Sequence, residues 1–152
     1  MLVLGLGGGD VIRLIRTLCP GVRVDAVEID RVIVSIARKY FGILTGSDLG
    51  IYTEDAESFV TRIRPGRYDL IIADLYSGDT MPDFETGTEF LRKLASALSP
   101  AGQLVINYSS LEVSPGDEKS LLDKLRKLFQ SVLKREIYTH KFFYAPHTEL
   151  KF

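Results

Sequence analysis

The first ten residues, Met1-Leu-Val-Leu-Gly-Leu-Gly-Gly-Gly-Asp10, decide the fold. Met1 to Leu4 is a short apolar run typical of a buried strand, and the glycines after it let the backbone turn sharply into an amphipathic run that begins at Val11. The sequence therefore predicts a strand, a tight turn and a helix N-terminus. In open α/β sheets a ligand usually binds at this place, beyond the carboxyl end of the first strand.

Asp10 argues against a dinucleotide at this turn. The pattern Gly5-x-Gly7-x-x-Asp10 places a carboxylate where the dinucleotide fingerprint needs its third glycine. At an effective dielectric near 20, two like charges roughly 5 Å apart cost on the order of 3 kcal/mol, or a factor of about 100 in binding. We therefore discount NAD and FAD. The alternative for Asp10 is a cap on the helix that begins at Val11, a role that does not exclude contact with a ligand.

The composition suits one globular domain. Of 152 residues, 45% are hydrophobic and 26% are charged, which is enough for a real core. The net charge of -1 gives no bulk attraction for nucleic acid or an anionic membrane. Cys19 is the single cysteine, and the region after Met1 has neither a basic start nor a long apolar segment, so we expect a cytoplasmic protein. We expect residues 1–152 to form a single nucleoside-binding, Rossmann-like domain.

Hydrophobic periodicity predicts five βα units followed by a β-hairpin. The expected strands are Met1 to Leu4, Val22 to Ile29, Ile51 to Thr53, Tyr68 to Ala73 and Gln103 to Tyr108, the last after a Pro100-Ala-Gly102 turn. The expected helices are Val11 to Leu18, Arg31 to Phe41, one that opens at Glu54-Asp55-Ala56, Thr88 to Leu98 and Asp117 to Val132. The hairpin pairs Lys134 to Tyr138 with Lys141 to Ala145. This pattern predicts an α/β, doubly wound sheet with parallel strands in the order 3-2-1-4-5 and an antiparallel hairpin beside strand 5.

The same periodicity assigns an inward face to each of the first two helices. The residues expected to face the sheet are Val11, Ile12, Leu14, Ile15 and Leu18 in the first helix, and Val32, Ile33, Ile36, Ala37, Tyr40 and Phe41 in the second.

Acidic residues follow the carboxyl ends of the predicted strands. Glu28 lies 21 residues after Gly7, the spacing at which an acid reaches the ribose hydroxyls of a bound nucleoside, although a solvated loop acid is the alternative. Asp55 either complements a helix dipole or accepts a hydrogen bond from an adenine amino group. Asp74 ends a near-continuous apolar run, typical of a strand buried on both faces, and is expected to lie over the pocket. With Asp10, Asp30 and Asp79 these residues predict an acidic mouth that suits a cationic ligand.

An ordered set of motifs resembles the spermidine synthase (polyamine aminopropyltransferase) family, within the class I S-adenosylmethionine-dependent methyltransferase-like superfamily. The motifs are Leu4-Gly-Leu-Gly-Gly-Gly-Asp10, Val27-Glu-Ile-Asp30, Glu54-Asp55-Ala56, Tyr68-Asp-Leu-Ile-Ile-Ala-Asp74 and Glu89-Phe-x-x-x-Leu ahead of Leu98-Ser-Pro-Ala-Gly102.

The resemblance implies a transferase in polyamine biosynthesis that uses decarboxylated S-adenosylmethionine as donor. Asp10 would hold the donor's aminopropyl ammonium, Glu28 its ribose and Asp55 its adenine, and Asp74 would orient the incoming amine and act as general base. The remaining donor-site residues would be Gly5, Gly7, Gly8, Gly9, Ile29, Asp30 and Ala56, with Asp74 also in contact with the donor, and the acceptor-site residues Tyr76, Ser77 and Asp79. We expect no metal, because His140 and His147 lie near no cluster with ligand spacing.

Three differences from that family keep two alternatives open. Val11 stands where the family usually has glycine, and Ser77 replaces the second carboxylate of its acidic loop, with Asp79 two residues further on. We expect the domain of residues 1–152 to lack the family's N-terminal β-domain. The alternatives are an S-adenosylmethionine-dependent methyltransferase and a degenerate, non-catalytic nucleoside-binding domain. We expect a small-molecule amine acceptor as partner and no contact of this domain with nucleic acid or membrane, with a homodimer as one option.

Overall fold

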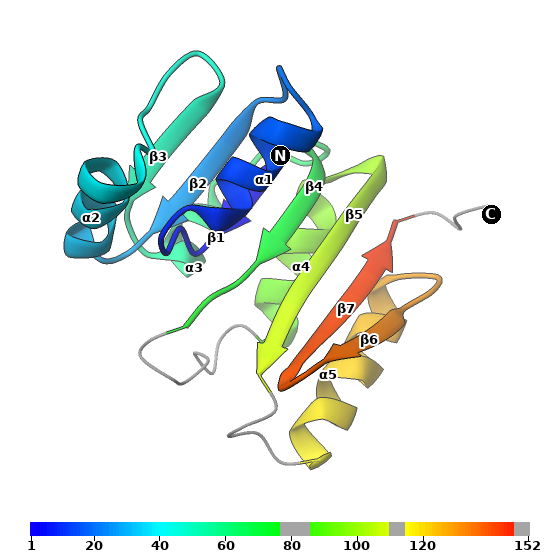
Figure 1. Ribbon diagram of the computed structural model, residues 1–152. Coiled ribbons are helices and arrows are strands. Elements are labelled where there is room, and N and C mark those ends of the chain that lie inside the picture. The colour runs from blue at the N-terminus through cyan, green and yellow to red at the C-terminus, as the bar shows by residue number, and fades with distance from the viewer. Residues whose placement is uncertain (77–85, 110–114, 148–152) are drawn as a thin grey trace.

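A computed structural model of the chain describes residues 1–76, 86–109 and 115–147. They form a seven-stranded sheet with helices on both faces (Figure 1). The strands are β1 (Leu2–Leu4), β2 (Val24–Glu28), β3 (Leu49–Thr53), β4 (Tyr68–Ala73), β5 (Leu98–Ser109), β6 (Leu133–Ile137) and β7 (His140–Pro146). The helices are α1 (Asp10–Leu18), α2 (Arg31–Phe41), α3 (Ala56–Thr61), α4 (Thr88–Ala97) and α5 (Pro115–Leu128).

The strand order is β3-β2-β1-β4-β5-β7-β6. The pairs among β1 to β5 are parallel, and β7 runs antiparallel to both β5 and β6. The predicted order 3-2-1-4-5 with a terminal hairpin beside strand 5 is therefore confirmed. Because β1 to β5 are parallel, their carboxyl ends meet at one edge of the sheet, as Figure 1 shows.

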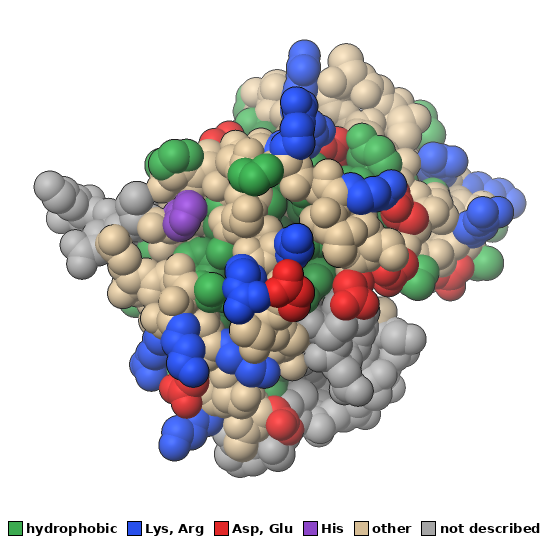
Figure 2. Space-filling view, turned by 180° about the vertical axis from the view of Figure 1, so that it is seen from behind, with side chains coloured by type: hydrophobic (Ala, Val, Ile, Leu, Met, Phe, Trp, Pro, Cys, Tyr) green, Lys and Arg blue, Asp and Glu red, His purple; other side chains and the backbone are tan. Residues whose placement is uncertain are grey.

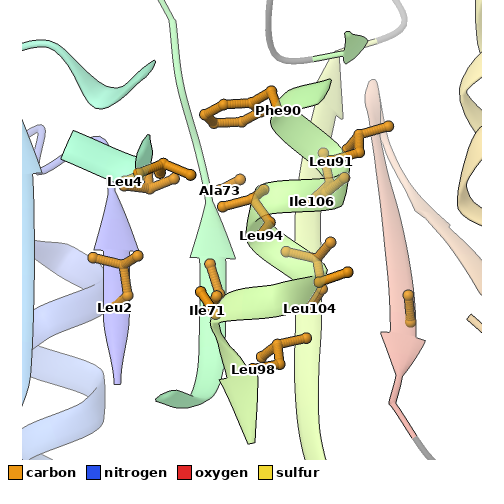
Figure 3. Close-up of a cluster of buried hydrophobic side chains, with 14 of the residues drawn as sticks. Leu2, Leu4, Ile71, Ala73, Phe90, Leu91, Leu94, Leu98, Leu104 and Ile106 are labelled. Atoms are coloured by element: carbon orange, nitrogen blue, oxygen red, sulfur yellow. The ribbon is translucent and has the colours of Figure 1, made fainter. Parts of the chain in front are cut away.

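Two apolar clusters cover the two faces of the sheet. Alternate residues of a strand point to opposite faces, so Leu2 and Leu4 belong to one cluster and Val3 to the other. The larger cluster packs α3, α4 and α5 against the sheet, and Figure 3 shows α4 residues such as Leu94 between strand residues such as Ile71 and Leu104. The smaller cluster packs α1 and α2 on the opposite face. Full burial of each such leucine or isoleucine contributes about 1.5 to 3 kcal/mol.

The predicted inward faces of α1 and α2 were partly wrong. In α1, Ile12 and Ile15 are buried, but Leu14 is 58% exposed and Leu18 is 68% exposed. Leu14 lies two residues after Ile12, which turns its side chain by about 200° around the helix axis, so both cannot face the sheet. In α2 the buried residues are Val34 and Ala37, whereas Val32, Tyr40 and Phe41 are exposed. Each helix buries a narrow stripe spaced by three residues, not the wide arc expected from counting apolar residues.

Strand β5 begins earlier than predicted. The expected Pro100-Ala-Gly102 turn lies inside β5, which starts at Leu98. Tyr68 pairs with Leu98 and Leu70 pairs with Gln103, so β5 bulges beside β4 before the regular register begins. Pro100 and Gly102 lie within the bulge, where they do not disturb the regular pairing. From Gln103 onward the strand pairs with β4 as predicted.

One face of the molecule carries side chains of both charges. Figure 2 shows basic and acidic side chains intermixed over the face seen from behind, with no area of one sign. In the described ranges, no helix is long and apolar enough to cross a membrane.

Candidate functional site

The glycine turn between β1 and α1 brings the chain close to two neighbouring strands. Gly5 has a φ of 91° and donates its N–H to the Val27 carbonyl at 2.9 Å, which ties the turn to the end of β2. Gly9 has a φ of 81° and forms the N-cap of α1. A Cβ on Gly9 would lie 2.4 Å from Cγ1 of Ile43, so this glycine packs against the body of the protein.

A cavity of about 720 Å³ lies beyond the carboxyl ends of β1, β2, β3 and β4. Pockets that bind small molecules and cofactors commonly measure about 300 to 1,000 Å³. The lining residues are Gly5, Leu6, Gly7, Gly8, Asp10, Val11, Val27, Glu28, Ile29, Asp30, Ile33, Glu54, Asp55, Ala56, Asp74, Leu75 and Tyr76. The structure thus brings together most of the residues singled out from the sequence. Gly9 does not line the cavity, and Ser77 and Asp79 lie outside the described residues.

Glu28 joins the glycine turn to the loop after β2. Its Oε2 accepts hydrogen bonds from the backbone N–H groups of Leu6 at 3.1 Å and Gly7 at 3.3 Å. Its Oε1 accepts one from the N–H of Asp30 at 3.1 Å. These bonds fix the orientation of the carboxylate, and Glu28 lines the cavity with further acceptor capacity for ligand hydroxyl groups.

Asp10 does not cap α1, so the capping alternative was wrong. Gly9 is the N-cap, and Asp10 is the first helical residue, where its charge complements the helix dipole. Its side chain pairs with the guanidinium of Arg13 one turn later and is 83% exposed. An exposed pair of this kind contributes at most about 1 kcal/mol, so Asp10 remains available to a ligand charge at the mouth of the cavity.

Asp30 and Asp55 each cap a helix at the cavity. Oδ1 of Asp30 accepts from the N–H of Val32 at 2.7 Å at the start of α2. Oδ2 of Asp55 accepts from the N–H of Ser58 at 2.7 Å at the start of α3. Beside them, Ile29 is exposed and Ala56 is buried. Both aspartates therefore have a structural role as well as a place in the cavity wall.

Asp74 follows β4 and is held by Asn107, which in turn contacts His140; the sequence analysis assigned neither residue to the site. Asn107 on β5 donates from Nδ2 to Oδ1 of Asp74 at 2.7 Å. The Oδ1 of the same amide lies 3.0 Å from Nδ1 of His140 on β7. The hydroxyl of Tyr76 donates to the backbone oxygen of Asn107 at 3.1 Å. A signal for Asn107 was present, since it stands at the carboxyl end of the strand predicted beside the one that ends in Asp74.

The cavity wall is acidic. Its carboxylates belong to Asp10, Glu28, Asp30, Glu54, Asp55 and Asp74. The described residues that line it include no lysine, arginine or histidine. Nearby guanidinium groups pair with the two outer acids, Arg13 with Asp10 and Arg62 with Glu54. A site lined by one sign of charge favours a ligand of the opposite sign, so this geometry suits a cation that also carries hydrogen-bond donors.

Comparisons with known proteins agree with this geometry. The Spermine/spermidine synthase domain model matches residues 1–144. Polyamine aminopropyltransferase from Vibrio vulnificus is 35% identical over 112 residues, which make up 72% of this chain and 38% of the relative. The eEF1A lysine and N-terminal methyltransferase of Danio rerio is 32% identical over 146 residues, which make up 90% of this chain and 21% of the relative. The chain thus spans less than half the length of these curated relatives.

A solved structure is similar over nearly the whole chain. Human methyltransferase-like protein 13 in complex with SAH superimposes with a TM-score of 0.85 at 27% sequence identity. The match covers 95% of this chain and 69% of that chain. The likeness confirms the class I methyltransferase-like fold that the motif resemblance implied.

Proposed function

This chain belongs to the spermine/spermidine synthase family, and from that premise we propose that it transfers the aminopropyl group of decarboxylated S-adenosylmethionine to an amine acceptor. The observation that carries the proposal is the acidic cavity of about 720 Å³ at the carboxyl ends of four strands. Decarboxylated S-adenosylmethionine carries a sulfonium and an ammonium and has no carboxylate. A polyamine acceptor is also cationic, so both reactants match the charge of the wall.

The donor's nucleoside would lie along the ends of β1, β2 and β3. Glu28 would accept hydrogen bonds from the ribose hydroxyls, because its Oε1 holds one protein donor and has capacity for another. Asp55 would accept from the adenine amino group, since Oδ2 holds the Ser58 N–H and Oδ1 has no protein donor in the described part of the chain. Gly5, Gly7 and Gly8 give the donor close access to the backbone, and Gly9 would support this turn from behind. Ile29, Asp30 and Ala56 would flank the nucleoside.

The aminopropyl tail would point toward Asp10, and the acceptor would approach along Asp74. Asp10 would pair with the donor's ammonium, in exchange for part of its exposed contact with Arg13. Tyr76 lines the cavity next to Asp74 and is proposed as an acceptor contact. Ser77 and Asp79, which follow Tyr76 in the sequence, are proposed as further acceptor contacts.

The chemistry is an in-line displacement at the carbon beside sulfur. The acceptor nitrogen forms the new C–N bond while the C–S bond breaks. The electron pair of the C–S bond passes to sulfur, which gives neutral 5'-methylthioadenosine. The acceptor amine must first lose a proton, because its pKa in water resembles the roughly 10.4 of lysine. Asp74 would orient that amine and accept the proton as general base.

A second candidate is methyl transfer from S-adenosylmethionine to an amine. The pairing of Arg13 with Asp10 favours it, because a guanidinium at this position offsets the repulsion between Asp10 and the carboxylate of S-adenosylmethionine. The Danio rerio relative, named as a lysine and N-terminal methyltransferase, is a further reason to test this donor.

Product analysis separates these functions. The protein would be incubated with each donor and a diamine such as putrescine, and the nucleoside product would be identified by mass spectrometry. Aminopropyl transfer yields 5'-methylthioadenosine, and methyl transfer yields S-adenosylhomocysteine. Asp74→Asn is the control, since it should abolish either product while leaving nucleoside binding intact. Binding of 5'-methylthioadenosine without turnover of either donor would replace the enzymatic proposal by a nucleoside-binding domain.

A further inference from the structure

The C-terminal hairpin reaches the acceptor side of the cavity through a chain of hydrogen bonds. We propose that Asn107 and His140 are positioning residues that hold the carboxylate of Asp74 in one orientation for the amine acceptor. This inference rests on the proposed function, in which Asp74 receives the acceptor.

The chain of bonds crosses three adjacent strands. Nδ2 of Asn107 is 2.7 Å from Oδ1 of Asp74, and Oδ1 of Asn107 is 3.0 Å from Nδ1 of His140. The sheet register explains these contacts: Ala73, the last residue of β4, pairs with Ile106, so Asp74 just after β4 comes beside Asn107 on β5. On the other side of β5, His140 pairs with the backbone of Ser109. Figure 1 shows β7 beside β5, with the start of β7 and the turn of the hairpin at the carboxyl end of the parallel strands.

Only one arrangement of protons satisfies these contacts. If the Asn107 amide were reversed, its oxygen would face the Asp74 carboxylate with no proton between two acceptors. Nδ2 therefore donates to Asp74, and the amide oxygen must accept from His140. The Nδ1 atom of His140 then carries a proton. The Asp74 carboxylate thus determines which way the amide of Asn107 points, and the Nδ1–H of His140 holds the amide in that orientation. The amide in turn holds Oδ1 of Asp74, so that Oδ2 is available to the acceptor nitrogen.

Two further bonds fix the ends of this chain. Tyr76 donates from its hydroxyl to the backbone oxygen of Asn107 at 3.1 Å, which ties the loop after β4 to β5 a second time. Next to His140, Nζ of Lys141 donates to Oε2 of Glu118 on α5 at 2.5 Å, which anchors the hairpin. Glu118 also pairs with Lys134 on β6, so α5 holds both strands of the hairpin. The position of His140 is therefore set by the tertiary structure and not by a loop alone.

The hydrogen-bond arrangement can be tested without turnover. Two-dimensional ¹H–¹⁵N correlation spectra of the histidine ring should show a proton on Nδ1 of His140 in the wild-type protein. The substitution Asn107→Leu removes the acceptor and should return neutral His140 to a mixture with the Nε2–H form. His140→Gln should keep the side-chain amide resonance of Asn107 at its wild-type shift, because glutamine can still donate, whereas His140→Leu should move it. An Nε2–H form of His140 in the wild-type protein would overturn the proposed chain.

Kinetics test the positioning role. Since misplacement of a reacting group by about 1 Å can cost on the order of 100-fold in rate, we expect Asn107→Leu and His140→Leu to lower kcat/KM for putrescine by about 10- to 100-fold at saturating donor. His140→Gln should stay close to wild type. The dissociation constant of 5'-methylthioadenosine should be unchanged in all three variants. His147→Leu is the matched control, because His147 bonds to the backbone of Ser99 and not to this chain.

The outcomes separate this inference from the proposed function. Variants that transfer as fast as the wild type would overturn the positioning role while leaving the transferase intact. Equal loss of nucleoside affinity and of activity in all variants would show a merely structural role. A protein that turns over neither donor yet shows His140 with Nδ1–H would overturn the proposed function and keep the hydrogen-bond chain.

Discussion

A Cβ atom on Gly5 would lie 2.0 Å from the backbone carbonyl oxygen of Asp74. At this point β1 and β4 leave room for a hydrogen atom and nothing larger. The N–H of Asp74 donates to the Leu4 carbonyl at 2.8 Å, so the two chains are also held together by a hydrogen bond. The glycine turn that lines the cavity and the residue proposed as general base are therefore fixed to each other through the backbone.

Gly5→Ala should strongly destabilise the protein. The new methyl group would collide with backbone that cannot move without breaking the β1–β4 pairing, and a φ of 91° is strained for alanine. We expect a loss of about 3 kcal/mol in the free energy of unfolding, measured by urea titration. Gly21→Ala is the matched control: it has a φ of 86° but no atom within 4 Å of the added Cβ, so it should lose only about 1 kcal/mol. Equal losses in both variants would remove the steric argument for Gly5.

Glu28→Gln should weaken every adenosyl ligand. Glutamine removes the negative charge and one acceptor oxygen from the wall of the cavity, and hydrogen bonds to a charged group are worth about 1 to 3 kcal/mol. Calorimetric titration with 5'-methylthioadenosine, which lacks an amino acid tail, isolates this contact. Glu57→Gln on the exposed side of α3 is the control and should bind as the wild type does. Unchanged affinity in Glu28→Gln would exclude Glu28 from the ligand site.

Asp25, at the end of the sheet opposite the cavity, should make the free energy of unfolding decrease at acidic pH. Its Oδ2 accepts from Arg67 at 2.9 Å and from the hydroxyl of Tyr68 at 2.7 Å. Burial alone would raise the pKa of Asp25, but the hydrogen bonds from Arg67, Tyr68 and Tyr52 and the charge of Arg67 hold this pKa below its usual value. Because the folded pKa is lowered, the stabilisation is present above the ordinary pKa near 4 and is lost as pH falls through the folded pKa.

Urea titrations between pH 7 and pH 2 test this prediction. Asp25→Asn should lower the free energy of unfolding at pH 7 by about 1 to 3 kcal/mol and make its fall below about pH 4 shallower. Asp123→Asn, at an exposed position of α5, should leave both the stability and the slope nearly unchanged. If the free energy of unfolding of Asp25→Asn fell as steeply below about pH 4 as that of the wild type, the role of this carboxylate would be contradicted.

The sheet and the general place of the site could be predicted because both depend on local patterns. Short apolar runs that alternate with amphipathic segments define βα units, and the right-handed crossover rule then restricts the strand order. Parallel strands also bring their carboxyl ends together, so Glu28, Asp55 and Asp74 could be placed at one edge from their positions alone.

The contacts of the site residues depend on information that local patterns do not carry. His140 reaches Asn107 only because the hairpin folds back beside β5 in one register, and that register is fixed by tertiary packing. The prediction of the buried faces of α1 and α2 was partly wrong for a related reason. When both sides of a helix carry apolar residues, an apolar residue such as Leu14 does not indicate which side faces the sheet. By contrast, the pairing of Asp10 with Arg13 follows from spacing on a helix and could have been predicted.

Asp10 and Arg13 together should set the preference between the two sulfonium donors. If the carboxylate of Asp10 faces the donor's ammonium, decarboxylated S-adenosylmethionine should bind more tightly than S-adenosylmethionine, whose own carboxylate would lie nearby. At an effective dielectric near 20 the difference is about 1 to 3 kcal/mol, a ratio of roughly 5 to 150 in dissociation constants. Asp10→Asn should shrink this ratio. Arg13→Gln should widen it, because the guanidinium that pairs with Asp10 is removed. Calorimetry with both donors measures the ratio, and 5'-methylthioadenosine should bind equally to all three proteins. A wild-type protein that prefers S-adenosylmethionine would contradict aminopropyl transfer and make methyl transfer the better hypothesis.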